Sequence, residues 1–263
     1  MQTGSVAWIR LENAVNARDL GELPIEGGGR IQPRRLLRSD NLQDLSPADI
    51  SRLVDELGLT TVIDLRSTSE VKQEGPGPLT SVDAVRIVNL SVIPETLGNT
   101  DAAAEALAMN RQRAAERDGV ADLMQSFYLG YLEDRPESIV TALREIAAAP
   151  GAALVHCAAG KDRTGTVVAM ALAVAGVPRD VVVADYVVTG ERIELILERL
   201  RSTPTYADDL ADSPTENHRP RAETMAGFLE HLDAGYGGVL GWLAEHGFGA
   251  EDVQLLRDKL LEV

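Results

Sequence analysis

One cysteine and one arginine stand six positions apart in this chain, and together they could act on a single anion. Cys157 is the only cysteine, and it lies between a short apolar run at 152–155 and a longer one at 164–175. A helix N-terminus and a nearby cation favour the thiolate, which is the form in which cysteine attacks an electrophile. Arg163 carries a planar fork that binds two phosphate oxygens at once, which lysine cannot match. The pair therefore predicts covalent chemistry at a phosphate group.

The residues around this pair could supply the other parts that hydrolysis of a phosphate monoester needs. Asp162 can donate a proton to the leaving oxygen and later take one from the attacking water. Thr164 is expected to donate a hydroxyl hydrogen bond to the thiolate, and His156 to support the loop. Gly160 permits the backbone torsions that point successive N–H groups at one ligand. We predict that the phosphate is held by Ala158, Ala159, Gly160, Lys161, Asp162 and Arg163.

Simpler interpretations of the same residues are weaker. A lone cysteine at the end of a buried strand is most often a small core residue, and Cys-x5-Arg alone is a weak pattern. The longer string from His156 to Gly165, set between a strand and a helix, argues against coincidence. A nucleotide P-loop is excluded because Asp162 stands where Ser or Thr must bind magnesium, and Val155 where the first glycine belongs. His156 lacks partners for a zinc site.

Composition limits the classes of protein to which the chain can belong. Its 263 residues suffice for one phosphatase domain over 1–263, and a single thiol excludes an internal disulfide framework. A formal net charge of −16 is unfavourable for nucleic-acid binding and for stable association with an anionic membrane. The N-terminus has no evident signal peptide, and no apolar run approaches 18 residues. We therefore expect a cytoplasmic protein.

The pattern of apolar residues predicts alternating strands and helices. Strands are expected at 35–38, 60–66, 84–90 and 152–156. Helices are expected from Ser46-Pro47 to Leu57, and at 101–134, 136–149, 164–175, 178–201, 222–234 and 250–261. Three prolines and many polar residues favour a flexible connector at 202–221. This order predicts an α/β fold with a mostly parallel central sheet flanked by helices.

The loop at 156–165 resembles that of the bacterial atypical tyrosine phosphatases. The likeness extends to segments outside the loop, which are Asn16-Ala17-Arg18-Asp19, Leu37-Arg38-Ser39-Asp40, Asp64-Leu65-Arg66-Ser67, Val183-Ala184-Asp185-Tyr186 and Gly235-Tyr236-Gly237-Gly238. The resemblance implies a phosphotyrosine-phosphatase-like fold, no metal or other cofactor, and an acid, Asp162, inside the loop. It also implies a helical lid at about 190–234, activity reaching phosphoserine, phosphothreonine and phosphoinositides, and secretion without a leader in some members. The Trp-Pro-Asp segment of conventional tyrosine phosphatases is absent, and Pro94-Glu95 is a weaker alternative source of the acid.

Several residues outside the loop leave more than one interpretation open. Arg66 should end a strand beside the catalytic strand, where it could touch substrate or form a structural ion pair. We expect Arg18 and Asp19 to brace the loop. For Asp185 and Tyr186, a role in packing or on a helix surface is favoured over a role in function. Two alternatives to a protein phosphatase also remain, namely a phosphate-binding module without turnover and a soluble inositol phosphate phosphatase.

Overall fold

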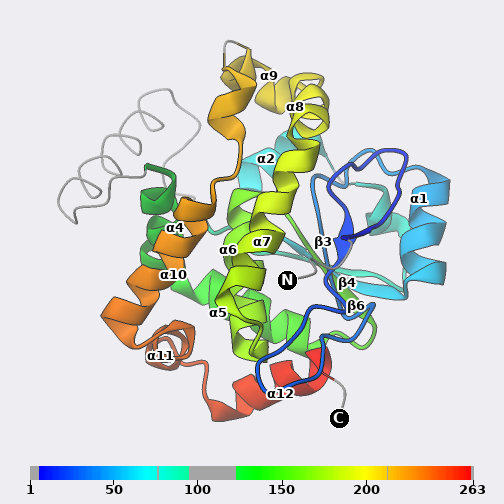
Figure 1. Ribbon diagram of the computed structural model, residues 1–263. Coiled ribbons are helices and arrows are strands. Elements are labelled where there is room, and N and C mark those ends of the chain that lie inside the picture. Colours follow the sequence, from blue (N-terminus) through cyan, green and yellow to red (C-terminus); the bar gives the residue numbers. More distant parts are fainter. Residues whose placement is uncertain (1–5, 76, 95–122, 212, 262–263) are drawn as a thin grey trace.

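A six-stranded sheet forms the centre of the computed structural model, which describes residues 6–75, 77–94, 123–211 and 213–261 (Figure 1). Its strands are β1 (Ala7–Trp8), β2 (Arg18–Asp19), β3 (Leu36–Ser39), β4 (Leu59–Asp64), β5 (Arg86–Asn89) and β6 (Ala152–His156). They lie in the order β1-β2-β3-β6-β4-β5. The four neighbouring strands β3, β6, β4 and β5 run parallel, while β1 and β2 add an antiparallel edge. The predicted mostly parallel α/β fold is confirmed.

Strand β6 lies in the interior of this sheet, paired with β3 on one side and β4 on the other. Its side chains alternate between two apolar clusters, Ala153 and Val155 in one and Ala152 and Leu154 in the other. This alternation follows from the two-residue period of a strand that is covered on both faces. Cys157, the next residue, therefore emerges at the carboxyl end of a central strand, where ligands of open α/β sheets bind.

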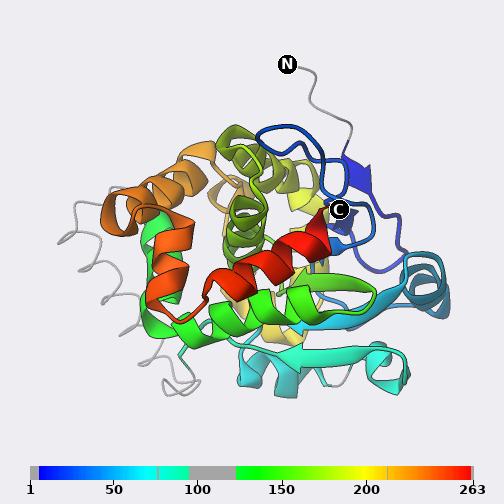
Figure 2. The ribbon, with the colours of Figure 1, turned by 90° about the horizontal axis from the view of Figure 1, so that it is seen from below.

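Helices cover both faces of the sheet. The face of Ala153 and Val155 packs against α4 (Leu123–Asp134), α5 (Pro136–Ala148), α6 (Asp162–Ala175), α7 (Arg179–Val188), α10 (Ala222–Tyr236), α11 (Val239–Glu245) and α12 (Ala250–Leu260). Within this layer α5 and α12 run side by side (Figure 2). The other face packs against residues 9–17, α1 (Pro47–Ser51), the π-helical turn η1 (Arg52–Glu56) and the 3-10 turn η2 (Pro78–Ser81).

A third group of short helices lies apart from these two layers. It comprises α2 (Thr68–Glu74), η3 (Thr189–Arg192), α8 (Ile193–Arg201), α9 (Pro204–Leu210) and η4 (Thr215–His218). In Figure 1, α2, α8 and α9 lie together at the top of the molecule, and α9 contacts both α2 and α8. Apolar side chains of α8 and α9 form a separate cluster with Ala158 and Ala159 of the loop after β6. This group therefore lies against the predicted phosphate loop.

Local sequence features explain where several elements begin and end. Ser46 caps α1 by accepting a hydrogen bond from the backbone of Asp49, whose carboxylate accepts from the backbone of Ser46 in return. Gly58, with φ +70°, follows the turn η1, and Gly176, with φ +89°, ends α6. Helix α6 begins at Asp162, two residues before the predicted start.

The structure corrects the prediction for residues 202–221. This stretch is not a flexible connector, because it contains α9 and η4. Thr203-Pro204 begins α9 just as Ser46-Pro47 begins α1, since proline is well suited to the first turn of a helix. The expected helix at 178–201 is interrupted by the 3-10 turn η3, and α2 and α11 were not predicted. Residues 101–122 of the helix predicted at 101–134, and Glu95, lie outside the described residues.

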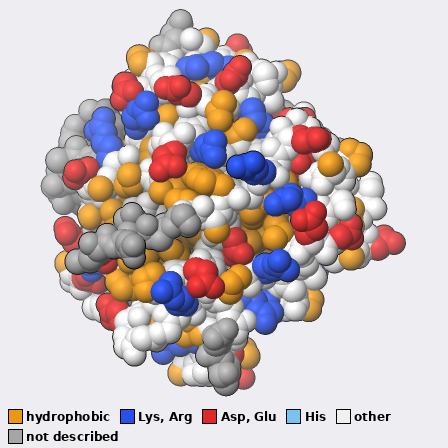
Figure 3. Space-filling model, turned by 45° about the vertical axis from the view of Figure 1, so that its right-hand side comes forward, with side chains coloured by type: hydrophobic (Ala, Val, Ile, Leu, Met, Phe, Trp, Pro, Cys, Tyr) orange, Lys and Arg blue, Asp and Glu red, His pale blue; other side chains and the backbone are white. Residues whose placement is uncertain are grey.

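The described part of the chain has no helix long and apolar enough to cross a membrane. On the face shown in Figure 3, basic side chains are interspersed with acidic and apolar ones.

Candidate active site

The loop after β6 places Cys157 in front of the N-terminus of α6. Cys157 is 2% exposed and follows the last residue of β6, and α6 begins five residues later. The N–H groups of the first turn of a helix have no partner within the helix, and they attract anions. The predicted strand, loop and helix therefore place Cys157 before a helix N-terminus, which is suited to binding an anion.

Gly160 is required by the shape of this loop. Its φ is +65°, and a Cβ at this position would lie 2.3 Å from the carbonyl oxygen of Ser39. Nδ2 of Asn16 donates to the carbonyl oxygens of Ala159 (3.0 Å) and Gly160 (3.1 Å), and Nη2 of Arg38 also donates to Gly160 (2.8 Å). In a trans peptide the N–H points opposite to the C=O. With these carbonyls held on the outside, the following N–H groups face the inside of the loop.

A buried network of charges fixes the residues that hold the loop. The carboxylate of Asp185 accepts from Nε of Arg18 (2.8 Å) and from Nη1 of Arg38 (2.5 Å), and Nη1 of Arg18 donates to Oδ1 of Asn16 (2.6 Å). Burial alone would raise the pKa of Asp185, but the two guanidinium groups hold it below its usual value. Burial and the charge of Arg38 lower the pKa of Arg18 to about 10. Arg18 thus braces the loop through Asn16, and Asp185 is part of the brace.

Asp19 takes a different position from the one expected. Its carboxylate accepts hydrogen bonds from the backbone N–H groups of Gly21 (2.9 Å) and Arg34 (2.8 Å). It therefore organises the turn between β2 and β3, and it contributes no hydrogen bond to the loop among the described residues.

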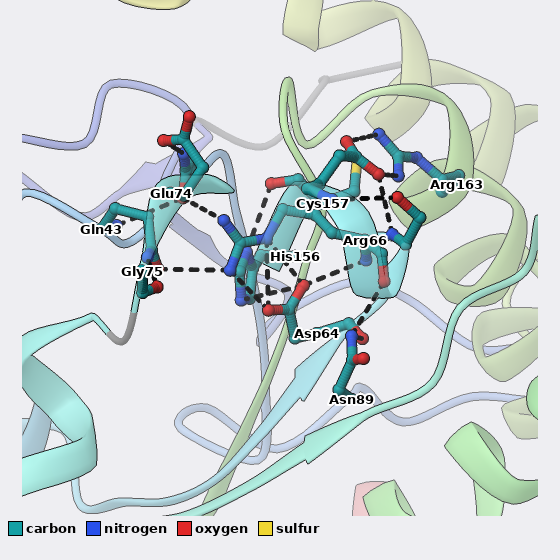
Figure 4. Close-up of polar contacts among 12 residues, drawn as sticks. Gln43, Asp64, Arg66, Glu74, Gly75, Asn89, His156, Cys157 and Arg163 are labelled. Atoms are coloured by element: carbon teal, nitrogen blue, oxygen red, sulfur yellow. Dashed lines mark hydrogen bonds and ion pairs between the residues drawn. The ribbon is translucent and has the colours of Figure 1, made fainter. Parts of the chain in front are cut away.

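Arg163 is held by a glutamate that the sequence analysis missed. Nη1 and Nη2 of Arg163 donate to the two carboxylate oxygens of Glu70 on α2, at 2.6 and 2.9 Å. Burial would raise the pKa of Glu70, but Arg163 and the N-terminal Ser67 of α2 outweigh it and lower the pKa to about 2. Burial would lower the pKa of Arg163, but Glu70 and then Cys157 raise it well above its usual value. Figure 4 shows the guanidinium on the side of the loop where the Cys157 sulfur lies.

Asp162 and Lys161 are also tied to distant elements. The hydroxyl of Tyr128 on α4 donates to Oδ1 of Asp162 at 2.6 Å, and Nζ of Lys161 lies 3.6 Å from the same oxygen. Nζ of Lys161 donates to the carbonyl oxygen of His218 in η4 at 2.7 Å. The two charged side chains that precede Arg163 are therefore positioned by α4 and by the segment after α9.

Arg66 forms a buried ion pair with Asp64. Its Nε and Nη2 donate to the Asp64 carboxylate at 2.9 and 2.6 Å, while Nη1 donates to Oδ1 of Asn41 and Nη2 donates also to Oε1 of Gln43 (Figure 4). Burial would raise the pKa of Asp64, but His156 and Arg66 hold it below its usual value. Of the two interpretations of Arg66, the structure shows the structural ion pair.

His156 and Thr164 border the loop from inside the core. Nδ1 of His156 lies 3.2 Å from the carbonyl oxygen of Cys157, and Nε2 lies 3.7 Å from Asp64. Burial lowers the pKa of His156, so its ring is neutral at pH 7. Oγ1 of Thr164 is buried and has no hydrogen-bond partner among the described residues. The predicted hydrogen bond from Thr164 to the Cys157 thiolate is therefore not formed in this structure.

The sequence did not predict four of the residues that contact the loop, which come from other parts of the chain: Glu70, Tyr128, Tyr206 and His218. For Asp185 the sequence favoured a packing role, and the structure shows it in buried ion pairs with Arg18 and Arg38. Ser67-Thr68-Ser69-Glu70 is a capping-box pattern, and it would have predicted the start of α2. Among the described residues, no group of three His, Cys, Asp or Glu side chains could hold a metal ion.

Comparison with known proteins agrees with this geometry. The profile described as the tyrosine phosphatase family matches residues 9–262. The triple specificity protein phosphatase PtpB of Mycobacterium tuberculosis is 29% identical over 275 residues, covering 95% of this chain and 98% of that protein. A predicted tyrosine-protein phosphatase of Cupriavidus necator is 30% identical over 88% of this chain and 80% of its own length. A tyrosine-protein phosphatase of Nostoc commune is 27% identical over 81% and 72%, respectively. The chain therefore belongs to the tyrosine phosphatase family, whose members are cysteine-dependent phosphatases.

Proposed function

We propose that Cys157 is the nucleophile of this phosphatase, Arg163 its phosphate-binding cation and Asp162 its general acid and base. The observation that carries this assignment is the position of Cys157, which lies at the end of β6, before the N-terminus of α6 and close to Arg163. The helix end and the guanidinium both stabilise negative charge, on the thiolate and on the phosphoryl oxygens that approach it.

The reaction would proceed in two displacements at phosphorus. In the first, the Cys157 thiolate forms an S–P bond while the P–O bond to the leaving group breaks, and Asp162 gives its proton to that oxygen. In the second, Asp162 takes a proton from water as the water oxygen attacks phosphorus, the S–P bond breaks and the thiolate is restored. Inorganic phosphate is released, and the enzyme returns to its starting state without a cofactor.

Arg163 can bind phosphate while it remains paired with Glu70. A guanidinium carries five N–H groups, and Glu70 accepts from two of them, one on each terminal nitrogen. The remaining three are available to phosphoryl oxygens. Glu70 would therefore fix the direction of the fork and lower its conformational freedom before substrate binds.

The helices α8, α9 and η4 would form a cover over the site, within a single phosphatase domain at 1–263 and a lid region at about 190–234. Support comes from Ala158 and Ala159, which pack against α8 and α9, and from two polar contacts. The hydroxyl of Tyr206 donates to Glu70 at 3.0 Å, and Lys161 donates to His218. In this arrangement α8, α9 and η4 would control how a phosphorylated side chain of a protein reaches the loop.

The chain acts on phosphorylated substrates, and we propose that its range extends from phosphotyrosine to phosphoserine, phosphothreonine and phosphoinositides. A relative named as a triple specificity phosphatase supports this range. Soluble inositol phosphates are the second candidate class, because Lys161 beside Arg163 favours densely charged ligands, whereas a net charge of −16 disfavours an anionic membrane. A free, buried thiol suits the reducing cytoplasm in which we place the protein.

A substrate panel tests the proposal. Phosphate release would be measured from a phosphotyrosine peptide, a phosphothreonine peptide and a soluble inositol phosphate, with wild type and Cys157→Ser in parallel. We expect kcat/KM to be highest for the phosphotyrosine peptide and Cys157→Ser to release no phosphate from any of them. Activity retained by Cys157→Ser would refute the assignment of the nucleophile. A higher kcat/KM for the inositol phosphate would favour the second substrate class.

A further inference from the structure

The two carboxylate oxygens of Asp162 have different surroundings. Oδ1 accepts the hydroxyl hydrogen bond of Tyr128 at 2.6 Å and lies 3.6 Å from Nζ of Lys161. In the part of the chain that the structure describes, no hydrogen bond reaches Oδ2. The Asp162 side chain is 23% exposed, so part of it is accessible to solvent. Oδ1 is thus fixed by protein donors, while Oδ2 is available for proton transfer.

With the proton of Asp162 on Oδ2, Tyr128 acts as a donor to Oδ1. A phenol has one proton, and this one is directed at Oδ1, so Tyr186, whose hydroxyl lies 2.7 Å away, must donate to the Tyr128 oxygen. Burial, and then the negative charge of Asp162, raise the pKa of Tyr128 well above its usual value. Tyr128 therefore stays protonated through catalysis and keeps its direction.

The ring of Tyr128 is held on several sides. It is fully buried. It makes T-shaped contacts with the rings of Tyr186 and Phe228, each at a centroid distance of 6.2 Å, and it stacks on the ring of Tyr131 at 6.0 Å. Such packing restricts χ1 and χ2 of the tyrosine and so fixes its hydroxyl. The chain has only five Tyr, three Phe and two Trp, and four of these aromatic residues gather beside Asp162.

Gly165 allows the second tyrosine to approach. A Cβ at this position of α6 would lie 3.0 Å from Cδ2 of Tyr186. Any larger residue would push the Tyr186 ring away from α6 and lengthen its hydrogen bond to Tyr128. The glycine of the loop motif thus acts through the tyrosine pair.

We infer that Tyr128, supported by Tyr186, is a positioning residue that holds Oδ1 of Asp162 so that Oδ2 carries the proton given to the leaving group. The inference rests on the proposed role of Asp162 as the acid. When the P–O bond breaks, the O–H bond at Oδ2 breaks with it and the proton passes to the ester oxygen, while Tyr128 retains its own proton. Tyr128 acts on the reaction only through Asp162.

A double-mutant cycle with two substrates tests this inference. Phenyl phosphate has a poor leaving group that needs protonation, whereas p-nitrophenyl phosphate has a good one. We expect Tyr128→Phe to lower kcat for phenyl phosphate about tenfold, the effect of losing one charge-assisted hydrogen bond, and to change kcat for p-nitrophenyl phosphate less than about twofold. In an Asp162→Asn background, Tyr128→Phe should change neither rate by more than about twofold, because the acid through which Tyr128 acts is already absent.

Phe248→Leu is the matched control, since it removes a buried ring from the same apolar core without altering the rings that pack on Tyr128 or a donor to Asp162. It should lower the melting temperature and leave the ratio of the two substrate rates unchanged. Two results would overturn the inference and leave the phosphatase assignment intact. One is an equal loss of kcat for both substrates in Tyr128→Phe. The other is that Tyr128→Phe lowers kcat for phenyl phosphate as much in the Asp162→Asn background as in the wild type. A wild-type protein that releases phosphate from neither ester would overturn both.

Discussion

Glu70 and Arg163 lie 93 positions apart in the chain and are joined by two parallel hydrogen bonds of 2.6 and 2.9 Å. The contact connects α2, which follows β4, with the first turn of α6, which follows β6. Glu70 also caps its own helix, since Oε2 accepts from the backbone of Ser67 at 2.7 Å. One carboxylate therefore stabilises a helix start and fixes the guanidinium of Arg163, the proposed phosphate-binding cation.

This pair predicts a pH dependence of stability. The pKa of Glu70 is about 2 in the folded chain against 4.5 ordinarily, so its contribution is complete above pH 4.5 and is lost as the pH falls towards 2. Glu70→Gln should lower the free energy of unfolding at pH 7 by about 2–3 kcal/mol and flatten its decline between those pH values. Urea unfolding at a series of pH values measures both, and parallel curves for the two proteins would contradict the expectation.

Replacing Asp162 by asparagine should produce an effect that depends on the leaving group. An amide cannot give up a proton, so Asp162→Asn should lower kcat for phenyl phosphate about a hundredfold and for p-nitrophenyl phosphate by less than about fivefold. Steady-state rates on the two esters provide the measurement. Equal losses would remove Asp162 from the role of acid.

Gly160→Ala should abolish the phosphate site. The added Cβ would meet the Ser39 carbonyl at 2.3 Å in a conformation with φ +65° that alanine disfavours, so the loop must shift. We expect kcat/KM to fall more than about a hundredfold because misplaced donors lose their catalytic effect. Gly235→Ala is the control, since nothing lies within 4 Å of that position in α10, and it should leave activity unchanged.

Asp185→Asn should destabilise the protein strongly. The change leaves Arg18 and Arg38, each 1% exposed, without their shared counter-charge, and breaking a buried pair in this way costs about 3–5 kcal/mol. The exposed pair of Arg52 and Glu56 offers a comparison, and Glu56→Gln should cost less than about 0.5 kcal/mol. Chemical denaturation of the two variants would show a difference, and similar midpoints would contradict it.

Tyr206→Phe should make the thiol more accessible. The variant removes the hydrogen bond from α9 to Glu70, one of the polar contacts that hold the proposed cover. Losing about 1 kcal/mol would raise the alkylation rate of Cys157 by iodoacetamide about fivefold. Tyr236→Phe, at the end of α10, should leave that rate unchanged. An unchanged rate in Tyr206→Phe would show that this contact does not limit opening.

The loop proposed to be catalytic could be predicted because its residues are contiguous, from His156 to Gly165, and because an apolar strand and helix flank it. Glu70 and Tyr128 could not, since their roles depend on long-range packing that brings α2 and α4 to the loop. The error at 202–221 had another cause. A polar stretch with three prolines favours a loop, but Pro204 stands at the start of a helix, as Pro47 does, where its missing N–H is not needed.

The small side chains of Ala158 and Ala159 have a consequence for how binding and opening are coupled. They belong to the loop that should hold phosphate, and they also pack under α8 and α9. A ligand that reshapes the loop must therefore alter the surface on which those helices rest, and linkage requires the reverse effect to be equal in free energy. Substitutions on the outer surface of α8 could then change the affinity for phosphate without touching it.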